Sequence, residues 1–226
     1  MPSRLSVVIP VLNEAATLRA TLEALQSLRS RGVDVVVADG GSVDGTADLA
    51  VGLADTVLSA PKGRARQMNA GARAAQGGVL LFLHADTALP AEADRLVLDG
   101  LAASGKAWGR FDARISGRPW LLRAVAFCMN RRSRWTGIST GDQAMFVRRE
   151  AFQALGGFPD QPLMEDIELS KRLRQTGPPL CLREPVATSG RRWERDGVCR
   201  TILLMWRLRW LYWRGVPAEK LAEEYR

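Results

Sequence analysis

Polar residues that could take part in chemistry follow three short apolar segments of this sequence. The segments are residues 5–10, 33–38 and 79–83, and the groups after them are Asn13-Glu14, Asp39-Gly40-Gly41-Ser42 and His84-Ala85-Asp86. Carboxylates at such points can accept hydrogen bonds from a nucleobase or ribose, or hold a divalent cation against a phosphate. A further acidic pair, Glu165-Asp166, could supply a base that removes a proton from a hydroxyl group.

The elements that must position these groups are parallel strands. Apolar segments at 5–10, 33–38, 55–58 and 79–83 are short and rich in β-branched residues, which indicates buried strands. Helical patterns lie between them: one that Asn13 caps and Gly32 ends, one at 44–53 and one at 63–75. This alternation predicts parallel βαβ units. We therefore expect the polar groups to share the carboxyl edge of one sheet, where ligands bind.

The second half of the sequence is less regular but continues the α/β pattern. We expect helices at 91–103, 119–132, 165–174, 198–213 and 217–225, and strands at 108–115, 143–147 and 180–188. No repeat, low-complexity segment or linker divides the chain. These patterns predict one domain over residues 1–226, with a mostly parallel central sheet, flanking helices and C-terminal helices.

Composition leaves several classes of anionic partner open. The chain has 226 residues and a formal net charge of +8, and 28 of its 32 basic residues are arginine. Such a charge suits a polyanionic ligand, nucleic acid or an anionic membrane surface, or arginines that are merely solvated. No apolar run reaches the length of a membrane span and no signal-peptide pattern occurs, so we expect a cytoplasmic protein. Three separated cysteines, Cys128, Cys181 and Cys199, are expected to be buried free thiols.

Missing motifs argue against other functions. The chain has no GxGxxG after its first strand and no GxxxxGK[ST], which argues against a dinucleotide oxidoreductase or a P-loop NTPase. A sugar-1-phosphate nucleotidyltransferase would need a basic, glycine-rich first loop, and here that loop is Val11-Leu12-Asn13-Glu14. Acidic strand ends would repel a nucleic-acid backbone, and no nucleic-acid-binding motif occurs, so we expect no nucleic-acid partner. A sugar-nucleotide binder without catalytic activity stays open.

Six motifs, taken in order, resemble the family 2 glycosyltransferases of GT-A fold. They are SVVIPVLNEAATL, VVVADGGSVDGT, KGRARQMNAGARAA, LFLHADT, GDQAMFVRREAFQALGGFP and MEDIELSKRLR, and the resemblance covers about residues 5–193. It implies an inverting enzyme with a Rossmann-like sheet and a nucleotide-diphosphate-sugar donor. Residues 1–90 would be the donor half, 91–193 the acceptor half and 194–226 a helical extension. FLHADT and TSGRRWERDG are similar to a subgroup that includes the selenosugar synthases of selenoneine biosynthesis.

The resemblance also implies roles for individual residues. Asp86 would hold Mg²⁺ or Mn²⁺ on the diphosphate, and Asp166, with Glu165 beside it, would be the catalytic base. The residues expected around the donor are Pro10, Asn13, Glu14, Asp39, Gly41, Ser42, Gly63, Arg66, Gln67, Asn69, His84, Ala85 and Asp86. The residues expected near the acceptor or its phosphate are Thr140, Gly141, Asp142, Gln143, Arg191 and Arg192.

Each of these carboxylates also has a purely structural explanation. Asp39 could be a turn residue before two glycines, and Asp86 could cap a turn before Pro90. Glu165 and Asp166 could complement the dipole at the start of a helix. The ordered motifs favour the functional explanation in each case.

His84 departs from the family pattern, which has an acid at this position. A neutral imidazole brings no negative charge, so Asp86 would hold a cation more weakly. The usual late histidine ligand is also missing, because His84 is the only histidine in the chain. Arg191 and Arg192 stand about where that ligand is expected and could neutralise the diphosphate directly. The alternative is that His84 only packs under the nucleotide.

The acceptor is expected to be anionic. Seven arginines crowd the segment before STGDQAMF, at positions 110, 114, 118, 123, 131, 132 and 134. Selenophosphate fits such a site, and inverting transfer of the sugar from UDP-glucose or UDP-N-acetylglucosamine to its selenium would give a β-selenosugar. The alternative is a lipid-linked or other hydroxyl acceptor, with residues 198–213 as a peripheral membrane contact through Trp206, Trp210 and Trp213. A core helix or dimer contact explains that segment equally well.

Overall fold

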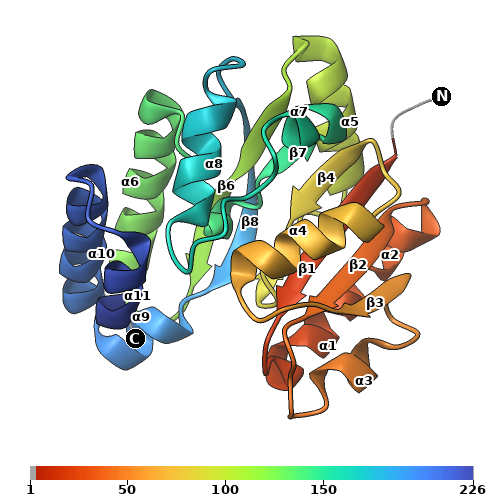
Figure 1. Cartoon of the computed structure of the whole chain (residues 1–226), viewed down its shortest axis with the longest axis horizontal. Coiled ribbons are helices and arrows are strands. Elements are labelled where there is room, and N and C mark those ends of the chain that lie inside the picture. The colour runs from red at the N-terminus through yellow and green to blue at the C-terminus, as the bar shows by residue number, and fades with distance from the viewer. Residues whose placement is uncertain (1–3, 226) are drawn as a thin grey trace.

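The computed structural model describes residues 4–225 and contains one eight-stranded sheet (Figure 1). The strand order is β3-β2-β1-β4-β7-β6-β8-β5, in which β7 and β5 run opposite to the other strands. The strands are β1 (Leu5–Val11), β2 (Asp34–Asp39), β3 (Thr56–Ser59), β4 (Val79–Phe82), β5 (Thr87–Ala88), β6 (Trp108–Ser116), β7 (Phe146–Arg148) and β8 (Leu180–Ser189). The mostly parallel α/β sheet predicted from the sequence is confirmed.

Helices cover both faces of this sheet. The helices are α1 (Ala15–Ala24), α2 (Gln26–Ser30), α3 (Thr46–Ala50), α4 (Arg64–Ala74), α5 (Ala93–Ser104), α6 (Leu121–Thr136), α7 (Arg149–Ala154), α8 (Glu165–Leu173), α9 (Arg191–Asp196), α10 (Val198–Trp213) and α11 (Ala218–Tyr225). None of the helices within residues 4–225 is long and apolar enough to cross a bilayer.

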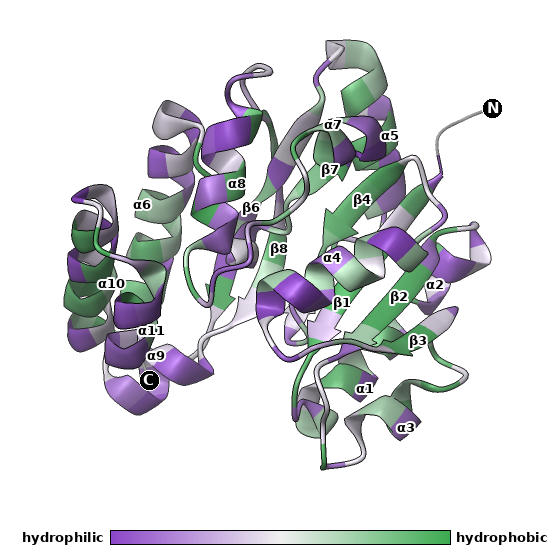
Figure 2. Cartoon of the chain, viewed as in Figure 1, coloured by the Kyte–Doolittle hydropathy of each residue, from purple (hydrophilic) through white to green (hydrophobic). Residues whose placement is uncertain are grey.

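The central strands are apolar on both faces because each face packs against a layer of helices (Figure 2). In β1, Val7 and Ile9 join the core formed with α1, α2, α3 and α5, whereas Val8 joins the core formed with α4, α7 and α8. This alternation follows from the two-residue period of a strand. Because β1, β2 and β4 are parallel, their carboxyl ends lie at one edge of the sheet, as expected.

The C-terminal helices extend the fold beyond the sheet. Val198 and Ile202 of α10 pack with Leu122 and Val125 of α6 in one apolar cluster. Further along α10, Leu208 packs in a second cluster with residues of α8 and α11. Figure 1 shows α10 and α11 at the end of the molecule next to α6 and α8.

Several local predictions are wrong. Asn13 does not cap α1: its φ is 55°, and its Oδ1 atom accepts the N–H of Val43 at 3.0 Å, joining two loops. The helix expected at 44–53 is only Thr46–Ala50, because the Asp44 carboxylate accepts N–H groups from Ala15 and Thr46 and so orders a loop. The strand expected from residue 143 begins at Phe146, after a 3₁₀ turn η1 (Gly141–Gln143). Cys128 and Cys199 are exposed rather than buried.

Candidate functional site

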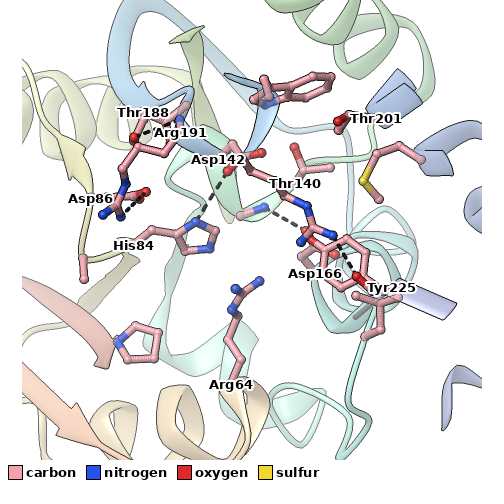
Figure 3. Close-up of a pocket in the computed structure, with 18 of the residues that line it drawn as sticks. Arg64, His84, Asp86, Thr140, Asp142, Asp166, Thr188, Arg191, Thr201 and Tyr225 are labelled. Carbon is pink, nitrogen blue, oxygen red and sulfur yellow. Dashed lines mark hydrogen bonds and ion pairs between the residues drawn. The ribbon is translucent and has the colours of Figure 1, made fainter. Parts of the chain in front are cut away.

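A polar cavity of about 780 Å³ opens at the carboxyl edge of β1 and β4 (Figure 3). Its walls come from the loops after β1 and β4, the start of α4, the η1 turn, the end of β8, and helices α8, α9, α10 and α11. It brings together thirteen of the predicted site residues: Pro10, Asn13, Glu14, His84, Ala85, Asp86, Thr140, Gly141, Asp142, Glu165, Asp166, Arg191 and Arg192. Segments separated by more than a hundred positions in the sequence therefore meet at one site.

At one side of the cavity, an arginine lies between two carboxylates. The Nη2 atom of Arg191 is 3.4 Å from Oδ2 of Asp86 and 3.8 Å from Oε2 of Glu14. Arg191 begins α9, and Asp86 and Glu14 follow β4 and β1. The structure thus brings an arginine to the acid expected to bear the cation, at the place where the sequence lacks a late histidine.

A second acidic group lies across the cavity at the start of α8. The Asp166 carboxylate accepts the N–H of Gly141 at 2.8 Å and the N–H of Ile167 at 2.7 Å. Burial raises the pKa of Asp166, and these hydrogen bonds oppose the shift without cancelling it. Burial and the charge of Asp166 also raise the pKa of Glu165, whose Oε1 atom is 3.8 Å from Nη1 of Arg64. A carboxylate with a raised pKa is well suited to accept a proton.

His84 lies between the two acidic groups. Its Nδ1 atom is 3.5 Å from Oδ1 of Asp142, and its ring packs against Gly141, where an added Cβ would be 2.3 Å from Nε2. Burial would raise the pKa of Asp142, but the hydrogen bond and charge of His84 outweigh it and lower that pKa. His84 therefore contacts the η1 turn, whose Gly141 N–H donates a hydrogen bond to Asp166.

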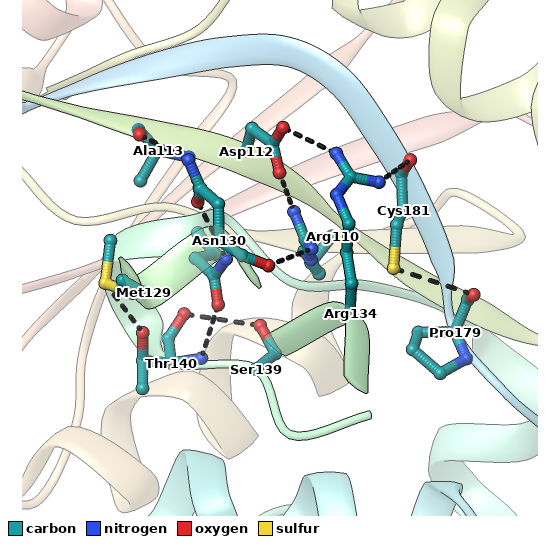
Figure 4. A network of polar contacts seen from close by, with 11 residues as sticks. Arg110, Asp112, Ala113, Met129, Asn130, Arg134, Ser139, Thr140, Pro179 and Cys181 are labelled. Carbon is teal, nitrogen blue, oxygen red and sulfur yellow. Dashed lines mark hydrogen bonds and ion pairs between the residues drawn. The ribbon is translucent and has the colours of Figure 1, made fainter. Parts of the chain in front are cut away.

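A buried polar network holds the η1 turn against the sheet (Figure 4). The amide of Asn130 on α6 pairs with both main-chain groups of Ala113 on β6, and its Oδ1 atom also accepts from Gln143 at 3.2 Å. Gln143 in turn accepts the N–H of Thr140 at 3.3 Å. The turn and the Gly141 N–H are thus tied to two elements of the core.

Eight predicted donor or acceptor residues do not line this cavity. The carboxylate of Asp39 accepts the N–H groups of Gly41 and Ser42 at 3.0 Å, as in a structural turn. Gln67 donates to the main-chain oxygens of Val11 and Ala38, where the amide braces β1 against β2. The other predicted residues also lie outside the cavity. Asn69 exchanges hydrogen bonds with the main chain of Phe158, and Arg66 forms an ion pair with Asp160. Gly63 immediately precedes α4, and Gln143 is buried in the network of Figure 4.

The prediction that seven arginines between positions 110 and 134 lie at the acceptor site is wrong. None of them lines the cavity, and Arg110 and Arg134 instead bind Asp112 inside the network of Figure 4. The cavity arginines are Arg64, Arg191, Arg192, Arg195 and Arg209. The sequence analysis missed Arg64, Arg195 and Arg209, although Arg64 stands inside the KGRARQMNAGARAA motif and begins α4.

The fit for a divalent cation is partial. Within the part of the chain that the structure describes, no three His, Cys, Asp or Glu side chains are grouped closely enough to hold a metal ion. Mg²⁺ is commonly held by one or two carboxylates together with substrate phosphates. Asp86, with Glu14 close by, meets that requirement only if the substrate supplies the other ligands.

Comparison with known families decides the affiliation. The family described as Glycosyl transferase family 2 matches residues 6–156, which is most of the chain and includes β1, β2, β4 and the η1 turn. The chain belongs to glycosyltransferase family 2.

Two relatives of this family 2 chain are similar over much of its length. Probable glycosyltransferase YdaM of Bacillus subtilis is 27% identical over 94% of this chain and 55% of that protein. Succinoglycan biosynthesis protein ExoA of Rhizobium meliloti is 33% identical over 76% of this chain and 58% of that protein. The chain therefore spans little more than half the length of either relative.

Solved structures show that this family 2 chain has a GT-A-like fold. Staphylococcus aureus TarS in complex with UDP-GlcNAc is 16% identical, with a TM-score of 0.67 over 82% of this chain and 58% of that chain. Glucosyl-3-phosphoglycerate synthase from Mycobacterium tuberculosis, in complex with Mn²⁺, UDP and glucosyl-3-phosphoglycerate, is 18% identical, with a TM-score of 0.59 over 82% and 72%. The expected fold class is confirmed.

Proposed function

We propose that the protein transfers a sugar, with inversion, from a UDP-sugar to an anionic acceptor. The observation that carries this proposal is the cavity in which Asp86 with Arg191 faces Asp166 among further arginines. One side of it suits a diphosphate leaving group and the other suits an incoming nucleophile. Family membership supports the reaction class, and the UDP and UDP-GlcNAc complexes of similar structures support the donor.

The donor would lie over the carboxyl ends of β1, β2 and β4. Pro10, Asn13 and Glu14 would surround it, and Asp39 would hold the nucleobase through the turn it orders. Arg191 would leave its carboxylate partners and bind the diphosphate bidentately, because guanidinium geometry matches phosphate oxygens. We propose glucose or N-acetylglucosamine as the sugar.

Asp86 would share a divalent cation, Mg²⁺ or Mn²⁺, with the diphosphate. When bound, the cation would neutralise charge that develops on the departing UDP. Because Asp86 has few neighbouring ligands, we expect Arg191 to carry part of that neutralisation. The Mn²⁺ in the complex of the similar synthase supports the use of a divalent cation.

The acceptor would lie toward α9 and α10, where a cationic group lines the cavity without a partner. Within residues 4–225, the buried Nε atom of Arg209 has no hydrogen-bond partner. Desolvated guanidinium groups of this kind gain most from an anion. The phosphoglycerate product named for a similar structure supports an anionic acceptor.

Selenophosphate is the acceptor that we propose first. Its selenium would attack the anomeric carbon, the bond to UDP would break, and UDP would leave with the electron pair. Because selenium is already ionised, Asp166 would have little proton to remove and would mainly orient the reactants. A cytoplasmic location fits such a reaction and the exposed free thiols.

A lipid-linked hydroxyl acceptor is the second candidate. Its support is the exposure of Trp206, Trp210 and Trp213 on α10, the helix that also lines the cavity through Met205 and Arg209. In that case Asp166 would act as a general base for the hydroxyl.

Product analysis would test the proposal. The full chain is incubated with UDP-glucose or UDP-N-acetylglucosamine plus selenophosphate, and sugars are examined by mass spectrometry. A selenium isotope pattern on a hexose-containing product is expected. UDP release without that pattern would overturn the acceptor, and no UDP from any UDP-sugar with any acceptor would overturn the transfer itself.

A further inference from the structure

Two neighbouring helices expose large apolar side chains that no other part of the described chain covers. On α6 and just before it these are Trp120, Phe127 and Trp135, and on α10 they are Leu203, Trp206, Trp210 and Trp213. Their exposed fractions lie between 55% and 77%. Apolar residues gathered in this way usually mark an interaction surface.

The two stripes face outward from the protein body. On α6, the residues are seven and eight positions apart, about two helical turns, and lie opposite Leu122, Ala126 and Ser133, which are buried. On α10, they recur every three or four positions, opposite Thr201 and Leu208. The two helices pack together through the cluster that contains Leu122 and Val198, so the two stripes belong to neighbouring helices.

The charged side chains of these two helices are all arginines, one of which, Arg207, pairs with Glu224 of α11 at 3.1 Å. Neither α6 nor α10 contains an Asp or Glu. Arg131 stacks on the rings of Phe127 and Trp135, at 5.8 and 4.9 Å from the ring centroids, and Arg214 lies 5.5 Å from the ring of Trp210. Guanidinium groups and aromatic rings are therefore presented together.

We propose that the outer faces of α6 and α10 form a docking surface for an anionic bilayer. Tryptophan favours the layer between lipid headgroups and acyl chains, and arginine is attracted to the negative surface potential of anionic lipids. A second copy fits poorly, because a two-fold interface would place two arginine-bearing faces without Asp or Glu of their own against one another. The proposal holds for either acceptor, since it concerns a face outside the cavity.

Docking would also orient the cavity. Along α10, Thr201, Met205 and Arg209 line the cavity, whereas Trp206 and Trp210 point outward. A bilayer on the outer face would therefore lie one helix away from the acceptor side of the site.

Vesicle flotation with the full chain tests this surface. Vesicles of phosphatidylcholine alone are compared with vesicles that also contain phosphatidylglycerol. The wild-type protein is expected to float with the anionic vesicles, with a blue shift of tryptophan fluorescence. Trp206→Ser and Trp135→Ser should each weaken binding about tenfold, and Arg131→Gln or Arg214→Gln about fivefold.

Matched substitutions elsewhere serve as controls. Val51→Ser removes an exposed apolar side chain far along the sequence from both helices, and Arg73→Gln removes an exposed arginine of α4. Both should bind as the wild type does, and thermal unfolding should confirm that every variant folds.

Three results would overturn the proposal. They are no flotation of the wild type with anionic vesicles, loss in the α10 variant without loss in Trp135→Ser, and a concentration-dependent dimer that the tryptophan substitutions abolish. Formation of UDP in vesicle-free solution is measured in parallel, so failure of docking is distinguished from failure of the proposed reaction.

Discussion

Arg191 on α9 places its Nη2 atom 3.4 Å from Oδ2 of Asp86, a residue 105 positions earlier in the chain. The same atom lies 3.8 Å from Oε2 of Glu14, so one arginine contacts the two carboxylates nearest the proposed diphosphate position. This pairing connects the donor loops to α9. It also explains how a site with His84 in place of an acid could still bind a dianionic leaving group.

Arg191→Ala should weaken UDP binding by about ten- to a hundredfold, because a charge-assisted bidentate contact to phosphate is lost. Isothermal titration calorimetry of UDP measures this directly. Arg73→Ala, which removes an exposed arginine of α4, is the control for net charge and should bind UDP normally. Equal affinity of Arg191→Ala and wild type would exclude Arg191 from the donor site.

Excess chelator separates the contribution of the arginine from that of a cation. We expect the wild type to keep part of its UDP-forming activity, since Arg191 neutralises charge without a metal. Arg191→Ala should lose all activity under the same conditions. Total loss in the wild type would instead indicate a conventional metal site.

Asp166→Asn distinguishes the two kinds of acceptor. With a hydroxyl acceptor, loss of the base should lower turnover about 10²–10⁴-fold. With selenophosphate, whose selenium is already ionised, the loss should be about tenfold or less. The ratio of the two rates is the measurement, and equal losses would contradict the argument from the ionised nucleophile.

Glu165→Gln should raise the melting temperature at pH 8 by a few degrees and change it little near pH 4. Burial and Asp166 raise the pKa of Glu165 in the folded protein. The loss of folding stability caused by ionised Glu165 is therefore absent at pH values below the ordinary pKa of a carboxyl group and complete at pH values above the raised pKa. Glu150→Gln, at an exposed carboxylate of α7, is the control. A loss of stability at pH 8 would show that the ion pair with Arg64 outweighs burial.

Asp39→Ala should abolish UDP binding, because the turn through Gly41 and Ser42 depends on its carboxylate. Ser42→Ala keeps the main-chain donors and should have a smaller effect. Calorimetry with UDP compares the two. Unchanged affinity in Asp39→Ala would remove this residue from the proposed site.

Local patterns predict most of the strands and helices because apolar periodicity reports burial directly. The bounds of α10 and the edge shared by β1, β2 and β4 follow from it. The prediction that Asn13 caps a helix is wrong because its side chain accepts a hydrogen bond from the N–H of Val43, a tertiary contact that no local pattern records. The short β5, α7 and α9 carry too few residues for a periodic signal.

The candidate site was predictable where a residue follows a strand and less so where a distant helix completes it. Glu14 and Asp86 follow β1 and β4 and line the cavity, and Asp166 lines it from the first turn of α8. Arg209 also lines the cavity but follows no strand, because only the packing of α10 brings it there. The expectation that the arginines before residue 135 mark the acceptor site fails for a similar reason. Arg110 and Arg134 form ion pairs with Asp112, a tertiary contact that sequence spacing does not reveal.

A crystal structure with UDP bound tests the central claim most directly. We predict that the diphosphate lies in the cavity between Asp86 and Arg191, with the Arg191–Asp86 contact rearranged and the uracil next to the turn of Asp39. UDP bound elsewhere, or in the cavity with Arg191 still paired to Asp86 and remote from the phosphates, would contradict the account.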